Sequence, residues 1–122
     1  MESPMNAGRD LDALVAERVM GWVHHPEQIL GMPPSTQAEF WTYMSGESRH
    51  HVPAIPSYST SLAAAWEVVE KFRGFEIIRI MDQYVVHIPA SILKDDYLVE
   101  GIVADTAPLA ICLAALKAVE KT

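Results

Sequence analysis

Five histidines are the residues of this 122-residue sequence that most directly suggest chemistry. They form two adjacent pairs, His24 with His25 and His50 with His51, and a single residue, His87. Imidazole is a common metal ligand, but adjacent residues of an extended chain point to opposite faces, so each pair offers one convenient ligand. No His-Glu-x-x-His or related spacing is present. We therefore predict no metal site and no cofactor, with imidazoles that lie on the surface or contact a ligand.

Aromatic and basic side chains gather in and beside the proline-rich segment from residue 23 to residue 58. A flat ring can stack on a base, and Arg or His side chains can bind phosphate oxygens. The alternative is that the rings fill the core or a subunit interface. We predict that this group binds a small nucleotide-like ligand. Its candidate residues are Trp22, Trp41, Tyr43, Arg49, His50, His51 and Tyr58.

A run of hydroxyl side chains at residues 57–61 precedes the most clearly helical segment. A helix N-terminus presents free N–H groups and positive partial charge, so a phosphate or carboxylate would bind well beside Ser59 and Thr60. Ordinary capping of the helix by one of the hydroxyls is the alternative. Arg79 and His87 belong to predicted strands and either join one of these two candidate sites or face solvent.

The sequence shows no recognisable catalytic motif. Its single cysteine, Cys112, lies in an apolar stretch, where a thiol is normally buried and unreactive. There is no Gly-x-Ser-x-Gly nucleophile turn and no glycine loop to cradle a phosphate. We expect that the protein is not an enzyme, with a hydrolase whose catalytic groups are distant in sequence as the alternative.

Three helices and a set of strands would position these side chains. Apolar residues at helical spacing predict helices over residues 10–21, 60–73 and 106–120. The last of these is apolar nearly all round, which predicts burial on two sides, either inside the domain or at a subunit contact. Strands are predicted over residues 75–81, 84–88 and 97–103, with a bulge or a close approach at Gly101.

The segment from residue 23 to residue 58 is predicted to be irregular because prolines punctuate it. Within it, Phe40–Met44 is rich in strand formers, residues 45–48 are typical of a turn, and Arg49–Val52 would return as a second strand. Helices at both ends with strands between them predict a single α/β (α+β) domain over residues 1–122. We expect a small α-β-α sandwich in which helices cover an antiparallel or mixed sheet.

The charge and composition of the sequence argue against several classes of partner. The formal net charge is −7 and only nine residues are Lys or Arg, which argues against polymeric nucleic acid as a partner. The longest strongly apolar run, Leu109–Leu116, is far shorter than the roughly 20 residues of a membrane span. The N-terminal residues do not resemble a signal peptide, and one cysteine permits no internal disulfide. We expect a cytoplasmic protein without a membrane partner.

Three segments together resemble the phage ABA sandwich domain family. They are Arg9–Trp22, Tyr58–Lys71 and Ala104–Lys117, about a third of the chain, and residues 23–57 between them diverge from the family pattern. The resemblance implies an α-β-α layered fold and a phage or prophage origin. The family has no established catalytic residues to transfer to this sequence.

The resemblance and the aromatic and basic group together suggest a function. We expect a homo-oligomeric phage protein that sequesters a nucleotide-derived immune signal of the host, a cyclic nucleotide or an ADP-ribose derivative, without cleaving it. This assignment is an analogy with phage proteins that act as signal sponges. The alternatives are a module that inhibits a host protein, an enzyme that degrades a nucleotide signal, and a structural or regulatory phage protein without a ligand.

Overall fold

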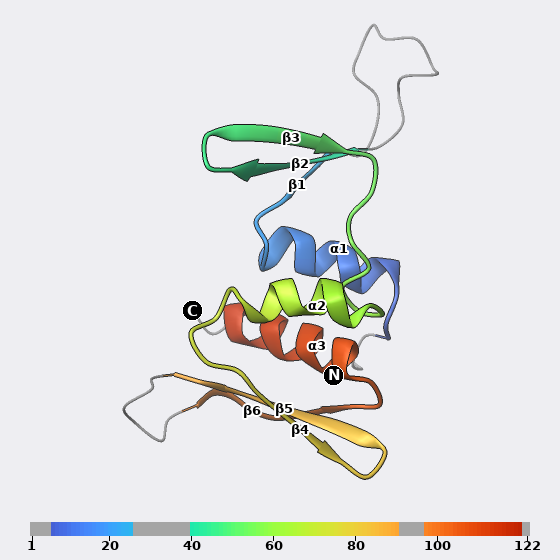
Figure 1. The fold of residues 1–122 in the computed structure, drawn as a ribbon, viewed down its shortest axis with the longest axis vertical. Coiled ribbons are helices and arrows are strands. Elements are labelled where there is room, and N and C mark those ends of the chain that lie inside the picture. Colours follow the sequence, from blue (N-terminus) through green and yellow to red (C-terminus); the bar gives the residue numbers. More distant parts are fainter. Residues whose placement is uncertain (1–5, 26–39, 91–96, 121–122) are drawn as a thin grey trace, which may run out of the picture.

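Three helices lie in a layer between two small antiparallel sheets in the part of the chain that the structure describes (Figure 1). The structure is a computed structural model, and it describes residues 6–25, 40–90 and 97–120. The helices are α1 (Arg9–Arg18), α2 (Leu62–Val69) and α3 (Ala107–Glu120). Sheet A consists of β1 (Val23–His25), β2 (Phe40–Ser45) and β3 (Ser48–Val52). Sheet B consists of β4 (Glu76–Ile80), β5 (Gln83–Pro89) and β6 (Tyr97–Ala104).

The predicted α+β class, with antiparallel strands layered against helices, is confirmed. The strands divide between two sheets on opposite sides of the helical layer, where the sequence analysis expected one sheet (Figure 1). The hairpin of β2 and β3 is present as predicted, with Met44 opposite Arg49. The segment 23–58 was predicted to be irregular apart from this hairpin, but its first three residues form the strand β1, which pairs with β2.

The helix α3 is buried on two sides, as its apolar sequence predicts. Ala110, Ala114 and Ala118 pack with the inward residues of sheet B, so small side chains let the helix approach the strands closely. Ile111 and Cys112 belong to a second cluster formed with α1 and α2. Because both clusters include residues of α3, this helix joins the two halves of the core.

A buried hydrogen-bond network ties the start of α1 to the segment before α2. The backbone N–H of Ser59 donates to the Asp12 carboxylate at 2.7 Å, and the N–H of Gly8 donates to the Ser59 hydroxyl at 2.8 Å. Ser61 caps α2 by accepting from the N–H of Ala64. These hydroxyls therefore have structural roles, which agrees with the capping alternative for the predicted anion site.

Two helices are shorter than predicted. The first was expected over residues 10–21 but ends at Arg18, and Gly21 follows with a positive φ of 75° that turns the chain toward β1. The second was expected over residues 60–73 but spans Leu62–Val69. Its last predicted turn is replaced by tighter three-residue hydrogen bonds, from the N–H of Lys71 to Val68 and from that of Phe72 to Val69. The apolar pattern continues past the point where the helical hydrogen bonds stop.

The predicted irregularity at Gly101 is a β-bulge. Val86 pairs with Ile102 but Ile88 pairs with Val99, so β6 has one residue more than β5 in this interval. Gly101 adopts a φ of 74°, and its N–H donates to Nδ1 of His87 at 2.9 Å. The imidazole thus accepts the hydrogen bond of a backbone group that the bulge removes from the strand ladder.

Candidate functional site

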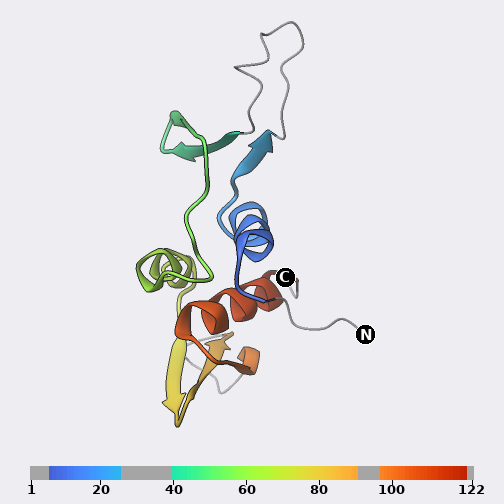
Figure 2. The ribbon, with the colours of Figure 1, turned by 90° about the vertical axis from the view of Figure 1, so that its right-hand side faces the viewer.

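The strand alternation of sheet A separates an inner face from an outer face. On the inner face, Trp41 is only 2% exposed and packs in the core cluster with residues of α1 and α2. Along each strand, every second side chain points the other way, and these side chains form the outer face. Sheet A lies at one end of the described part of the molecule, with the helices and sheet B on its other side (Figure 2). A ligand can therefore reach this face without displacing a described element.

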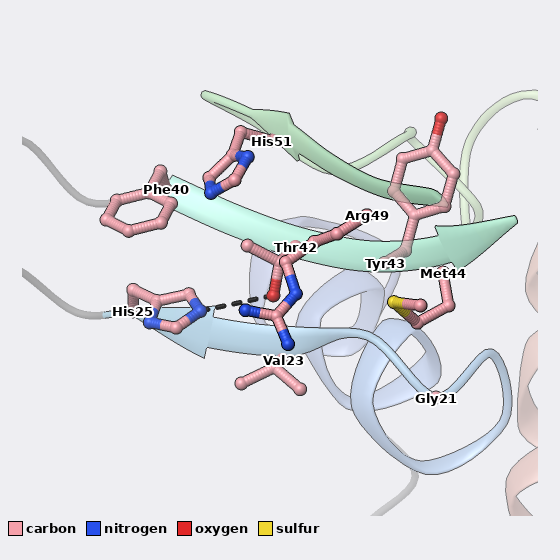
Figure 3. Close-up of a pocket in the computed structure, with 9 residues that line it drawn as sticks. All are labelled: Gly21, Val23, His25, Phe40, Thr42, Tyr43, Met44, Arg49 and His51. Carbon is pink, nitrogen blue, oxygen red and sulfur yellow. Dashed lines mark hydrogen bonds between the residues drawn. The ribbon is translucent and has the colours of Figure 1, made fainter. Parts of the chain in front are cut away.

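The outer face carries a shallow pocket of about 240 Å³ (Figure 3). All three strands of sheet A and the turn after α1 contribute to it, so the pocket exists only when the three strands are paired. Its lining residues are Gly21, Val23, His25, Phe40, Thr42, Tyr43, Met44, Arg49 and His51.

The polar centre of the pocket is formed by Thr42, His25 and Arg49. Thr42 is 7% exposed, and its hydroxyl forms a hydrogen bond of 3.1 Å with Nε2 of His25. The side chain of Arg49 extends from β3 across β2 toward these two residues (Figure 3). The described residues that line the pocket include no Asp or Glu. The pocket therefore offers a positive charge and a hydroxyl beside each other.

An aromatic ring and two imidazoles form one end of the pocket. The rings of His25 and Phe40 stack with centroids 4.4 Å apart and an interplanar angle of 6°. His51 approaches the same phenyl ring from β3, at 5.7 Å and 31°. The three rings lie together on the outer face (Figure 3). This end combines a flat apolar surface with nitrogen atoms that can contact an anion.

The inner face of sheet A holds two columns of stacked rings that support the pocket from behind. Tyr43 stacks between Trp22, at 4.5 Å, and His50, at 4.8 Å. His24 stacks on Trp41 at 4.2 Å. The indole Nε1 of Trp41 is buried and has no hydrogen-bond partner within the described ranges. These contacts fix the strand positions, and the strands in turn fix the outer side chains.

The structure brings together only part of the predicted binding group. Arg49 and His51 line the pocket, and so does Tyr43, although its ring stacks with Trp22 and His50 on the inner face. Trp22, Trp41 and His50 lie on the inner face or in its ring columns and do not line the pocket. Tyr58 and Ser59 are buried in the core, with 1% and 0% of their surface exposed. Thr60 is exposed and precedes α2. Arg79 and His87 belong to sheet B, on the far side of the helices. The predicted role of each residue in ligand binding stays a prediction.

Sequence reasoning missed Phe40 and Thr42 as pocket residues. It predicted that the imidazole of His25 lies on the surface or contacts a ligand, but it did not place His25 in the candidate binding group. The alternation of the strand contained the signal, because Trp41 and Tyr43 share one face and their neighbours share the other. Trp41 and Tyr43 occupy the inner face of β2, so Phe40 and Thr42 lie on its outer face.

The thiol of Cys112 and the phenol of Tyr58 lie in the core. Burial raises the pKa of the Cys112 thiol to about 12, and nearby Asp12 adds to the effect. Burial, followed by the charge of Glu67, also raises the pKa of Tyr58 well above its usual range. Within residues 6–25, 40–90 and 97–120, no three His, Cys, Asp or Glu side chains come together as a metal site. In the same ranges, no helix is long and apolar enough to cross a membrane.

Comparison with known proteins supports the predicted family. The model of the phage ABA sandwich domain family matches residues 13–116. The crystal structure of a phage protein from Bacillus cereus ATCC 14579 is similar, with 26% sequence identity and a TM-score of 0.55 over 98% of this chain and 93% of the other. No curated protein matches the chain. The family match covers most of the sequence, and the chain belongs to the phage ABA sandwich domain family.

Proposed function

We propose that this phage-family protein binds a small nucleotide-derived immune signal of the host in the outer pocket of sheet A and holds it intact. The observation that carries the proposal is the guanidinium of Arg49, which extends into a pocket whose described lining residues include no carboxylate. In a chain with a net charge of −7, a cation held in this way favours an anionic ligand.

The neighbours of Arg49 suit a phosphate group. A guanidinium offers two parallel N–H donors to phosphate oxygens, and the Thr42 hydroxyl lies in the same pocket. His25 forms a hydrogen bond with Thr42 and so holds that hydroxyl in place. One phosphate bound to this group would replace water with charge-assisted hydrogen bonds.

The ring cluster suits the base of a nucleotide. Stacking of a base on an aromatic side chain contributes about 1–3 kcal/mol. Phe40 and the imidazoles of His25 and His51 provide flat surfaces next to the phosphate-binding group. The anti-defence role itself is inferred from the phage family, by analogy with proteins that sequester signals without cleaving them.

The test is to identify the small molecule that co-purifies with the protein. We would purify it from bacteria with an active nucleotide-signalling defence, denature it by heat, and analyse the supernatant by mass spectrometry. We expect an intact cyclic nucleotide or ADP-ribose derivative at stoichiometric amount. The variant Arg49→Gln should release none, whereas Arg79→Gln, which removes an exposed arginine of sheet B, should release as much as the wild type.

An empty supernatant from the wild type, together with no binding of added nucleotides, would contradict the proposal. Release of equal amounts from Arg49→Gln would place the ligand elsewhere. Recovery of a cleaved product in place of the intact signal would support the enzyme alternative.

A second candidate function is inhibition of a host protein through sheet B. The outer face of this sheet exposes Ile78, Ile80 and Val103 by 44–54%, and Met81 at the hairpin tip is 86% exposed. Exposed apolar side chains that cluster in this way are typical of protein-interaction surfaces. Stable capture of one host protein that is lost in Ile80→Glu, with no small molecule bound, would favour this function.

A further inference from the structure

The outer pocket of sheet A is open toward solvent. Its volume of about 240 Å³ is below the roughly 300–1,000 Å³ of most small-molecule sites. The lining residues come from one sheet face and one turn, so they contact a ligand from one side. A single copy therefore covers one phosphate and one base and leaves the rest of a larger nucleotide in water.

Apolar side chains border this opening. Val23 is 54% exposed and Met44 is 58% exposed, and both line the pocket. A partner that binds over the pocket would bury the apolar area of these two side chains. Burial of Val23 and Met44 would therefore stabilise its binding in addition to the contacts with the ligand.

The charges of the face determine what can cover it. The guanidinium of Arg49 and the imidazoles of His25 and His51 lie on the outer face, and the described residues that line the pocket include no Asp or Glu. Two copies of the same face would bring two Arg49 side chains together, so they would repel each other without an anion between them. A ligand with two phosphate groups supplies the missing negative charge to both faces.

No described helix or strand stands in front of the outer face of sheet A. Its outer face lies at one end of the molecule, and the helices and sheet B lie behind it (Figures 1 and 2). Two copies related by a two-fold axis would use the same surface on both sides, as most homodimers do.

We propose that two copies of this chain pair through the outer faces of sheet A around one ligand with two phosphates, and that Arg49 of each copy binds one phosphate. A cyclic dinucleotide is the ligand class with this symmetry. The inference rests on the proposed function, because it assigns the partner and the ligand class to the same pocket. Val23 and Met44 of each copy pack against the other copy.

The test compares a ligand with two phosphates and a ligand with one. The molar mass of the protein is measured by light scattering, and ligand stoichiometry by calorimetry, with cyclic di-AMP and with AMP. We expect cyclic di-AMP to double the mass at one ligand per two chains. AMP should bind one per chain and leave the mass unchanged.

Two variants locate the contact. Met44→Glu places a carboxylate at the rim of the pocket, and we expect it to abolish the doubling of mass. Leu62→Glu changes an apolar residue of similar exposure at the start of α2, 55% against 58%, and should retain the doubling. Circular dichroism of both variants verifies that they fold like the wild type.

The outcomes separate the two proposals. Binding of cyclic di-AMP at one per chain, with no change in mass, would overturn the pairing and leave the proposed function intact. Failure of both nucleotides to bind at millimolar concentration would overturn the proposed function and the pairing with it. A mass that doubles equally in the wild type and in Met44→Glu would place the contact on another face.

Discussion

Replacement of Asp12 by alanine tests how the N-terminal helix is held on the core. Asp12 is 7% exposed, and its carboxylate accepts the N–H of Ser59, which lies 47 residues away in sequence and is 0% exposed. Asp12→Ala leaves this N–H buried without its acceptor. Hydrogen bonds to charged groups contribute about 1.5–3 kcal/mol, and a buried unpaired donor costs a similar amount.

The expected loss follows from these contributions and from the helix dipole. Asp12 also stands in the first turn of α1, where a negative side chain contributes about 0.3–1 kcal/mol. Because the two contributions overlap at one carboxylate, we expect Asp12→Ala to lower the free energy of unfolding by about 2–3 kcal/mol. Asp12→Asn retains an oxygen acceptor and should lose about half as much.

The assay is urea unfolding followed by circular dichroism, with Asp10→Ala as the matched control. Asp10 lies in the same first turn but is exposed, so its replacement removes only the dipole contribution. We expect Asp10→Ala to cost less than about 1 kcal/mol. Equal losses for Asp10→Ala and Asp12→Ala would refute the claim that the buried hydrogen bond anchors α1.

Three further predictions concern the bulge, the buried thiol and the pocket. Gly101→Ala should lower the free energy of unfolding by about 1–2 kcal/mol, measured by urea unfolding, because φ is +74° and no atom within 4 Å adds a steric cost. Cys112 should react with a thiol reagent only after unfolding. Because folding raises the pKa of Cys112 to about 12, the native state keeps a proton that the unfolded chain releases. Stability should therefore fall as the pH rises from about 9 to 12, and less steeply in Cys112→Ala. Arg49→Lys should weaken nucleotide binding in calorimetry by about tenfold, since a lysine lacks the paired donors.

The elements with strong local signals were predictable from the sequence. The apolar pattern of the last helix predicted its burial on two sides, and Gly101 predicted the irregularity in β6. The β2–β3 hairpin was predictable because strand formers flank a polar turn around Gly46, which adopts a φ of 64°.

The missed features depend on contacts between distant segments. The strand β1 has three residues, two of them histidines, and carries no strand signal of its own. It forms because His24 pairs with Trp41 and His25 with Phe40, across residues 26–39. Without β1 the sequence could not show that His25, Thr42 and Arg49 share one face, so the pocket was not predictable.

The most direct test of the central claim is to locate nucleotide binding by nuclear magnetic resonance. AMP is titrated into nitrogen-labelled protein, and the backbone amide signals are followed. We expect the signals of Thr42, Arg49 and His51 to move with a common dissociation constant, while those of Arg79 and His87 on sheet B stay in place. Shifts confined to sheet B, or no shifts at millimolar AMP, would contradict the assignment of the binding site to the outer pocket of sheet A.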